Sequence, residues 1–270
     1  MLSKLLFVAL VASPLVAAHG KVAVITGDAG GNTTALGIQG GIVPGPGKNS
    51  VTEVDTTVFN SKKALSNGLG KTTGGGANTL AGMSAVMAQS GSVLPQVSNG
   101  GSISGTIHIV TTDGAGPYTA VVDPTGTGAF ASGTEATVTT QVPGKNGNIA
   151  APNQRRFLPR MLVKMGLMKR AKNVNEDYPF SATIPAGTTC SGTVGGQSNV
   201  CLVKLVNPSG AGPFGGVIAI QMAGAANSSA APAAAPAAAA AGTTTAEAAK
   251  AGKAGAAAKK AKPVGAKFRA

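Results

Sequence analysis

Aromatic side chains are scarce in this chain, which has no tryptophan, two tyrosines and seven phenylalanines among 270 residues. Proteins commonly use tyrosine and tryptophan rings as flat, amphipathic contact surfaces. Only Tyr118 and Tyr178 remain for stacking on sugar rings. A polysaccharide-binding surface of the usual aromatic kind is therefore not expected.

The signatures of common hydrolases are also missing. Only two histidines occur, His19 and His108, and the sequence contains neither a Gly-x-Ser-x-Gly nor a His-Glu-x-x-His pattern. Glu176 and Asp177 are adjacent, so in a strand they would point to opposite faces, and we expect a solvated turn there. Serine-triad, zinc-protease and glycosidase chemistry consequently have little support.

No apolar run is long enough for a membrane anchor, which needs about 20 residues. Residues 1–18 combine Lys4, an apolar stretch and small residues before a cleavage position after Ala18. We expect a secretory signal peptide and a secreted, extracellular product without a transmembrane segment.

Secretion agrees with the sparse cysteine content. Cys190 and Cys201 are the only two cysteines, and an oxidising compartment would let them pair in a disulfide that closes a short loop. Asn32 and Asn227 each begin an Asn-x-Ser/Thr glycosylation sequon.

Acidic residues number 9 against 22 basic ones, and the excess is concentrated in two segments. A basic amphipathic insertion, about residues 154–172, carries Leu158, Met161 and Leu162 at helical spacing, and Lys169-Arg170 within it resembles a dibasic processing site. Residues 223–270 form an Ala/Pro/Lys-rich tail that we expect to be disordered. Such segments attract polyanionic surfaces without choosing among them, and we consider nucleic acid an unlikely partner.

What the chain has in abundance is glycine, 40 residues, together with threonine, serine and valine. This composition favours short strands joined by glycine turns. The prediction is an all-β core over residues 19–222, an immunoglobulin-like β-sandwich with long glycine-rich loops. His108 would lie near the turn of a hairpin between the strands at 103–111 and 118–122, and residues 79–88 would form a short helix. The predicted strands cover residues 20–25, 103–111, 118–122, 136–142, 178–184, 200–206 and 217–221.

The two histidines suggest a metal site. Cleavage after Ala18 would make His19 the first residue, so its α-amine and imidazole could chelate one metal ion while His108 supplies a third nitrogen. Three such nitrogens in a plane suit copper, an arrangement called a histidine brace. The alternatives are that His108 is an ordinary polar residue of a strand and that His19 is an accident of the cleavage site.

Several stretches resemble the Egh-type family of secreted fungal virulence factors of the appressorium, the infection structure. The resemblance covers most of residues 20–222 and implies an extracellular, infection-related protein. The stretches are Ala81-Gly-Met-Ser-Ala-Val-Met-Ala-Gln89, Leu94-Pro-Gln-Val-Ser98, His108 with Asp113-Gly-Ala-Gly-Pro117, Ile184-Pro-Ala-Gly-Thr-Thr-Cys190 and Gly212-Pro-Phe-Gly-Gly216.

A weaker resemblance is to the lytic polysaccharide monooxygenases, copper enzymes with an immunoglobulin-like sandwich. It implies that His19 and His108 hold copper, that Phe214 faces the metal and that Gln221 lies close behind the ligands. The absence of tryptophan and the presence of Val217, where related sequences often have cysteine, depart from that pattern. The alternative function is a non-catalytic cell-wall-associated or adhesive protein that binds acidic surfaces through its insertion and tail. Both readings name a polysaccharide or cell-wall surface, anionic or neutral, as the partner.

Overall fold

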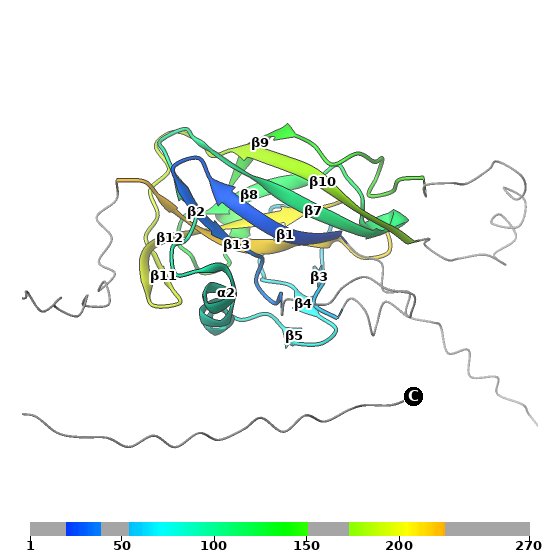
Figure 1. Ribbon diagram of the computed structural model, residues 1–270, viewed down its shortest axis with the longest axis horizontal. Coiled ribbons are helices and arrows are strands. Elements are labelled where there is room, and N and C mark those ends of the chain that lie inside the picture. Colours follow the sequence, from blue (N-terminus) through cyan, green and yellow to red (C-terminus); the bar gives the residue numbers. More distant parts are fainter. Residues whose placement is uncertain (1–19, 39–53, 151–172, 225–270) are drawn as a thin grey trace, which may run out of the picture. The chain divides into compact units, whose positions relative to one another are not determined.

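One continuous sheet of thirteen strands runs through the parts of the chain that the structure describes. The structure is a computed structural model, and it describes residues 20–38, 54–150 and 173–224, all of which belong to one compact unit (Figure 1). Almost all strand pairs are antiparallel; β6 and β13 pair in parallel. The all-β prediction is confirmed at this level.

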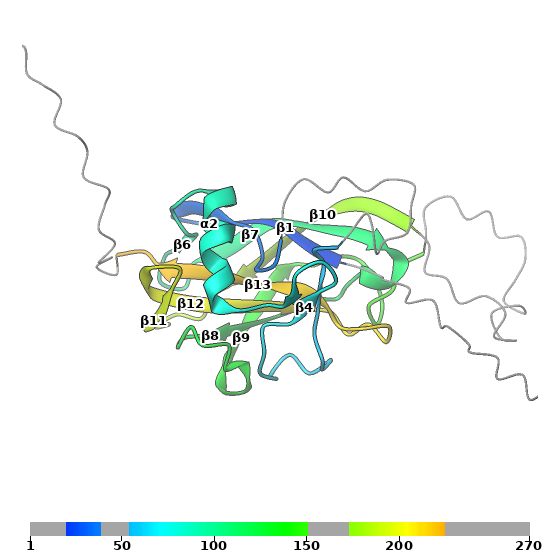
Figure 2. The same ribbon diagram turned by 90° about the horizontal axis from the view of Figure 1, so that it is seen from below.

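The sheet curls back on itself, so that two layers face each other (Figure 2). We call the first the β7 layer: it consists of β2 (Gly30–Thr33), β1 (Gly20–Gly27), β7 (Ser102–Thr111), β10 (Asn173–Thr183) and β9 (Thr134–Thr140). The second, the β12 layer, follows with β8 (Thr119–Asp123), β12 (Gln197–Val206), β13 (Phe214–Met222), β3 (Thr57–Val58), β4 (Lys71–Thr72) and β5 (Gly76–Ala77). The short strands β11 (Gly192–Val194) and β6 (Gln96–Val97) add to β12 and β13. Strand β9 joins the layers because it pairs with both β10 and β8.

The main hydrophobic core lies between the two layers. Ile107 and Ile109 of β7 are fully buried there with Val203 of β12 and Ile218 of β13. The layers approach closely at Gly216, where a Cβ atom would lie 3.2 Å from Cγ2 of Val22. A glycine at this point of β13 lets β1 pass over it.

A second core lies on the other face of the β12 layer, under the one α-helix in the described ranges. Residues 80–82 form a 3-10 turn, η1 (Leu80–Gly82), that continues into α2 (Met83–Ser90). Met83 and Met87 are buried against residues of β12 and β13 such as Leu202 and Val217. The helix predicted at 79–88 is confirmed, and its methionines fill the core as expected.

Because both of its faces are covered, the β12 layer buries nearly every residue of its long strands. Lys204 of β12 is a charged residue among these buried ones. Its Nζ atom lies 2.9 Å from the carbonyl oxygen of Ser66, to which it donates a hydrogen bond. The ammonium also lies 4.6 Å from the ring centre of Phe59 and 5.5 Å from that of Phe130. Burial lowers the pKa of Lys204 to about 8.

The hairpin predicted between residues 103–111 and 118–122 is wrong. Strand β7 pairs with β1 and β10, whereas β8 pairs with β12 and β9 in the other layer. The 3-10 turn η2 (Thr112–Gly114) and the residues after it carry the chain across. The physical reason is that β8 is buried on both faces, since four of its five residues are buried. A strand paired with β7 as its hairpin partner would have one face in solvent.

The disulfide is confirmed, since Cys190 and Cys201 are bonded and close a loop that contains β11 and the first residues of β12. Several predictions concern residues outside the described ranges: the signal peptide with cleavage after Ala18, the basic insertion at 154–172 with Lys169-Arg170, the sequon at Asn227 and the tail from residue 225 onward. Within the described ranges, α2 is too short to cross a membrane, and no other helix there qualifies.

Candidate functional site

His108 lies on the outer face of the β7 layer, near the end where β1 begins. Its neighbours Ile107 and Ile109 point into the core, so the alternation of β7 turns the imidazole outward, as predicted. Lys21 of β1 and Asp177 of β10 lie directly opposite His108 on either side. Residues directly opposite in antiparallel strands share a face, so the three side chains form one row.

The imidazole is held by the carboxylate. Nδ1 of His108 lies 2.7 Å from Oδ1 of Asp177, and the side chains are 16% and 67% exposed. A carboxylate only accepts hydrogen bonds, so Nδ1 carries the proton and donates. The other nitrogen, Nε2, is buried and has no hydrogen-bond partner in the described part of the chain. It is a ring nitrogen with a free lone pair, the form in which histidine binds metals.

The other cross-strand neighbour, Lys21, is engaged elsewhere. Its Nζ atom lies 2.9 Å from Oδ2 of Asp55, a residue whose side chain is fully buried. This ion pair ties β1 to the segment that leads into β3. The charge of Lys21, in the strand next to His108, is thus compensated by the Asp55 carboxylate.

Gly20 fixes the beginning of β1 close to this row. It lies opposite Ile109, the residue after His108. A Cβ atom at Gly20 would lie 1.8 Å from the hydroxyl oxygen of Tyr118, which donates a 2.7 Å hydrogen bond to the carbonyl of Gly114. Only glycine fits here, and burial raises the pKa of the Tyr118 phenol. His19 precedes Gly20 and lies outside the described residues.

Phe214 starts β13 at the same end of the molecule as Gly20. It is buried, and its backbone NH donates to Oδ1 of Asn207 at 2.8 Å. By alternation it shares the face of β13 that carries Ile218 in the interlayer core, whereas His108 is on the outer face of β7. Its suggested position facing a metal gains no support from this placement and stays a prediction.

Gln221 belongs to the opposite end of β13, and its suggested place close behind the metal ligands gains no support from this and stays a prediction. It lies seven positions, about 23 Å of strand, from Phe214. Its side chain accepts a 2.8 Å hydrogen bond from Gln96 and donates one of 2.7 Å to the carbonyl of Ser198. Gln96 in turn contacts the far end of β1 at Gly27. The resemblance that suggested Gln221 carried no information on which end of the strand meets His108.

Asp177 is the functional candidate that sequence reasoning missed. Glu176 and Asp177 were expected in a solvated turn, but both belong to β10, and they point to opposite faces. Glu176 accepts a hydrogen bond from the Tyr178 hydroxyl, and this bond raises the pKa of Tyr178 to about 12. Asp177 turns to His108. A strand predicted to begin before residue 178 would have placed Asp177 on the outer face by alternation.

Neither tyrosine offers a free ring for sugar stacking. Tyr118 is buried, and Tyr178 is half-buried against the main core. The large apolar side chains that are exposed in the described ranges are Val24, Leu65 and Val93, none of them aromatic. The described residues also contain no group of three or more His, Cys, Asp or Glu side chains arranged for a metal ion.

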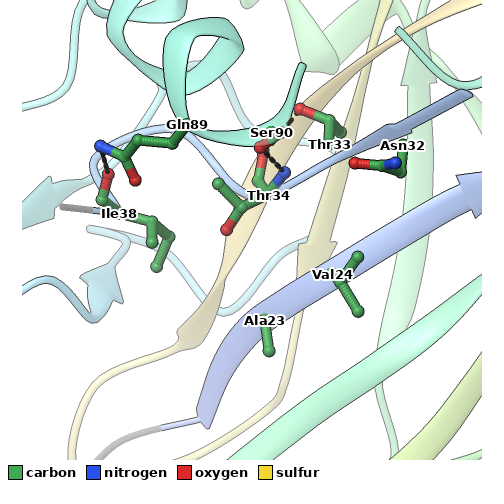
Figure 3. Close-up of a pocket in the computed structure, with 8 residues that line it drawn as sticks. All are labelled: Ala23, Val24, Asn32, Thr33, Thr34, Ile38, Gln89 and Ser90. Atoms are coloured by element: carbon green, nitrogen blue, oxygen red, sulfur yellow. Dashed lines mark hydrogen bonds between the residues drawn. The ribbon is translucent and has the colours of Figure 1, made fainter. Parts of the chain in front are cut away.

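An open groove of about 490 Å³ lies away from His108, between β1, β2 and the end of α2 (Figure 3). Ala23 and Val24 of β1 line it, and so do Gln89 and Ser90 of α2. Asn32, the first residue of a sequon, also lines it. Strand β2 thus forms one wall of the groove.

Comparison with known proteins gives relatives by sequence. The appressoria-specific virulence factor GAS1 of Pyricularia oryzae is 38% identical over 231 residues, which cover 85% of this chain and 82% of the relative. The appressoria-specific virulence factor GAS2 of the same organism is 36% identical over 138 residues, or 51% of this chain and 41% of the relative. No solved structure is significantly similar.

A family model matches residues 17–215, which include His19, His108, Asp177 and the disulfide. The match spans most of the sheet described above, and with the similarity to GAS1 it confirms the resemblance seen in the sequence. The chain belongs to the family of Egh16-like virulence factors.

Proposed function

We propose that this chain is a secreted fungal protein of the infection structure whose mature form binds copper through His19 and His108 and acts on a cell-wall or host-surface polysaccharide. The relatives named as appressoria-specific virulence factors support the biological setting. In this proposal residues 1–18 are removed, residues 19–222 form the folded core and the tail from 223 stays outside it. The two layers around one core also fit the proposed relation to immunoglobulin-like sandwiches.

The observation that carries the copper proposal is the state of His108. Its Nδ1 is occupied by Asp177, and its Nε2 is buried without a partner among the described residues. A buried polar nitrogen left unpaired costs free energy, about 1–3 kcal/mol, unless a ligand satisfies it. A metal ion is a ligand that suits a neutral imidazole whose other nitrogen donates to a carboxylate.

The position of β1 supports the second half of the site. Gly20 pairs with Ile109 and Lys21 with His108, so His19 precedes by two positions the residue that lies opposite His108. Removal of residues 1–18 would leave a free α-amine and an imidazole on His19. Together with Nε2 of His108 they would make three nitrogen ligands, a set that suits copper.

Copper so held supplies one-electron chemistry, and this chain's own residues would set the conditions for it. Asp177 holds the His108 ring in one tautomer and orientation. Asp55 pairs with the ammonium of Lys21, the residue opposite His108 on β1. Gly20, packed on Tyr118, fixes where the mature terminus emerges from the sheet.

A row of hydroxyl side chains on the same face as His108, about 13 Å away along β7, supports contact with a polysaccharide. Thr26, Ser104 and Ser181 lie side by side across β1, β7 and β10, and Thr140 of β9 follows Ser181. These side chains share the outer face with His108 and are exposed or half-exposed. Small hydroxyl groups in a row on the outer face of the sheet offer hydrogen bonds to sugar hydroxyls without aromatic stacking.

The copper proposal is tested with the mature chain 19–270 carrying a free His19, compared with the same chain extended by one residue before His19. We expect one copper(II) ion to bind the first with an electron paramagnetic resonance signal of nitrogen ligation, and the extended chain to give a different, weaker site. His108→Ala should also weaken binding. Identical spectra for the free and extended chains would refute the brace.

Activity is tested separately by adding a reductant and chitin, glucan or pectin and searching for oxidised sugars. Mass spectrometry of secreted protein shows whether chains begin at His19. If copper binds and no sugar is oxidised, binding remains and the enzymatic part of the proposal fails.

The second candidate function is a non-catalytic cell-wall-associated or adhesive protein. It is favoured by the absence of an exposed aromatic ring among the large apolar side chains of the described ranges. Binding would then depend on the basic insertion at 154–172 and the tail. A pull-down on insoluble cell-wall polysaccharide at low and high salt distinguishes the two, because charge-driven binding is lost at high salt.

A further inference from the structure

The groove between β1, β2 and α2 is bordered by Asn32, the first residue of a glycosylation sequon. We propose that Asn32 carries an N-linked glycan and that the first sugars of this glycan lie in the groove, over Val24. The proposal rests on the passage through the secretory pathway that is part of the proposed function, and it is independent of copper.

Asn32 is placed to carry such a modification. It lies on β2 opposite Thr26, its residue is exposed, and its side-chain amide makes no hydrogen bond to any described residue. The backbone around it is fixed: its NH donates to the carbonyl of Val93 at 3.3 Å. A glycan here would be attached to a strand whose backbone is held by β1 on one side and by Val93 on the other.

The burial of Thr34, the third residue of the sequon, requires that the modification precede folding. Thr34 is 8% exposed, and its hydroxyl donates to the carbonyl of Val22 at 3.4 Å. The transferase needs this residue in an accessible, extended chain, so it must act before β2 packs against β1. In that step Nδ2 of Asn32 forms a bond to C1 of the first N-acetylglucosamine. The bond from C1 to the diphosphate of a lipid-linked oligosaccharide breaks, the diphosphate leaves with the electron pair, and Asn32 loses one amide proton.

The groove has the size and the lining that a sugar requires. Its volume of about 490 Å³ lies within the range of small-ligand pockets. Val24 is 41% exposed although it is apolar, and it lies diagonally across from Asn32, a separation of about 7–8 Å between backbones. The CH-bearing face of a sugar ring can cover it. On the opposite wall Gln89 Nε2 donates to the carbonyl of Ile38 and Ser90 Oγ accepts from the NH of Thr34 (Figure 3), which leaves the Gln89 side-chain oxygen and the Ser90 hydroxyl proton for the sugar.

The modification is tested in yeast with two forms of the full chain, one with its own first 18 residues and one with these replaced by a yeast secretion leader. Peptide mass spectrometry should find hexose and N-acetylglucosamine on the peptide that contains Asn32. Asn32→Gln should remove this mass, whereas Asn227→Gln, at the other sequon, should leave it in place. An unmodified Asn32 in protein secreted by the yeast leader would overturn the proposal.

The two forms separate this proposal from the proposed secretion. If only the form with the yeast leader reaches the medium, the native signal peptide is refuted. Glycan on Asn32 in that form still supports the proposal made here.

The position of the glycan in the groove is tested by heat denaturation before and after enzymatic removal of the sugar. We expect removal to lower the Tm by about 2–4 °C. Val24→Ser should reduce this loss because the apolar floor is gone, whereas Leu65→Ser, at a residue of similar exposure (44%) outside the groove, should keep it. An equal loss in all three proteins would show that the sugar does not lie on Val24.

Discussion

His108 and Asp177 face each other across β7 and β10, with 2.7 Å between Nδ1 and Oδ1. Because the carboxylate accepts, the proton of a neutral ring must be on Nδ1, and Nε2 becomes the nitrogen that a ligand can use. Asp177, which lies 69 positions away in the sequence, therefore decides which ring nitrogen of His108 carries the proton.

Asp177→Asn should weaken copper binding about 10- to 100-fold. An asparagine can turn its NH2 group toward Nδ1, which then accepts, so the proton moves to Nε2 and blocks the ligand position. The measurement is a competition titration of copper(II) against a chelator of known affinity, together with the electron paramagnetic resonance spectrum.

Glu176→Gln is the matched control for that variant. It removes the same charge one residue earlier, but Glu176 bonds to Tyr178 and points to the other face. Its copper affinity should equal that of the unchanged protein. A similar loss in both variants would mean that net charge matters and not the bond to His108.

Lys204 should make the protein more stable as the pH rises from about 8 to 10. Its pKa in the folded state is about 8, against about 10.4 in an unfolded chain. In this window the unfolded state binds more protons than the folded one, so the free energy of unfolding increases with pH. Urea denaturation at several pH values measures the slope.

Lys204→Met should abolish this rise, whereas Lys71→Met, at an exposed lysine, should leave it unchanged. Above pH 10 the trend should reverse, because the buried Tyr118 keeps its proton in the folded state while an unfolded chain releases it. A flat profile between pH 8 and 10 in the unchanged protein would contradict the prediction.

Asp123→Ala should lower the free energy of unfolding at pH 7 by about 2–4 kcal/mol. Asp123 is buried at the end of β8 and accepts hydrogen bonds from the Thr125 hydroxyl and from the backbone NH groups of residues 125 and 127–129. Burial alone would raise the pKa of this carboxyl, but these bonds outweigh it and hold the pKa below its ordinary value.

The loss should shrink in acid. A depressed folded pKa gives stability that is present above the unfolded value, about 3.9, and disappears as the pH falls through the folded value. Urea denaturation of both proteins at pH 7 and pH 3 tests this. A difference of the same size at both pH values would indicate packing and not the charged carboxylate.

Replacing Cys190 and Cys201 together by alanine should reduce the free energy of unfolding by about 2–4 kcal/mol. The bond joins residues 11 positions apart and restricts the unfolded chain between them. In the folded protein Cys201 belongs to β12 and is buried in the main core. Denaturant titration of the double variant measures the loss. A double variant as stable as the unchanged protein would show that the bond does not stabilise this fold.

Local patterns predicted local structure well in this chain. The alternation at 103–111 gave β7 and the outward direction of His108, and the apolar spacing at 79–88 gave the short helix, because both depend on neighbouring residues alone. The pairing of β8 could not be predicted in this way. Strand β8 pairs with β12 and not with β7, which precedes it in the sequence, because this position buries the side chains on both of its faces. The partner residues on β12 lie about 80 positions away in the sequence.

The sequence by itself determined that this is a β-rich protein with one disulfide and a single histidine on the polar face of β7, since composition, alternation and the cysteine count are properties of the chain. Only the tertiary structure decided that Asp177 faces His108, that Gln221 lies at the far end of β13 and that Asn32 borders a groove. These are contacts between strands distant in sequence, and their register is set by how the whole sheet curls around its core.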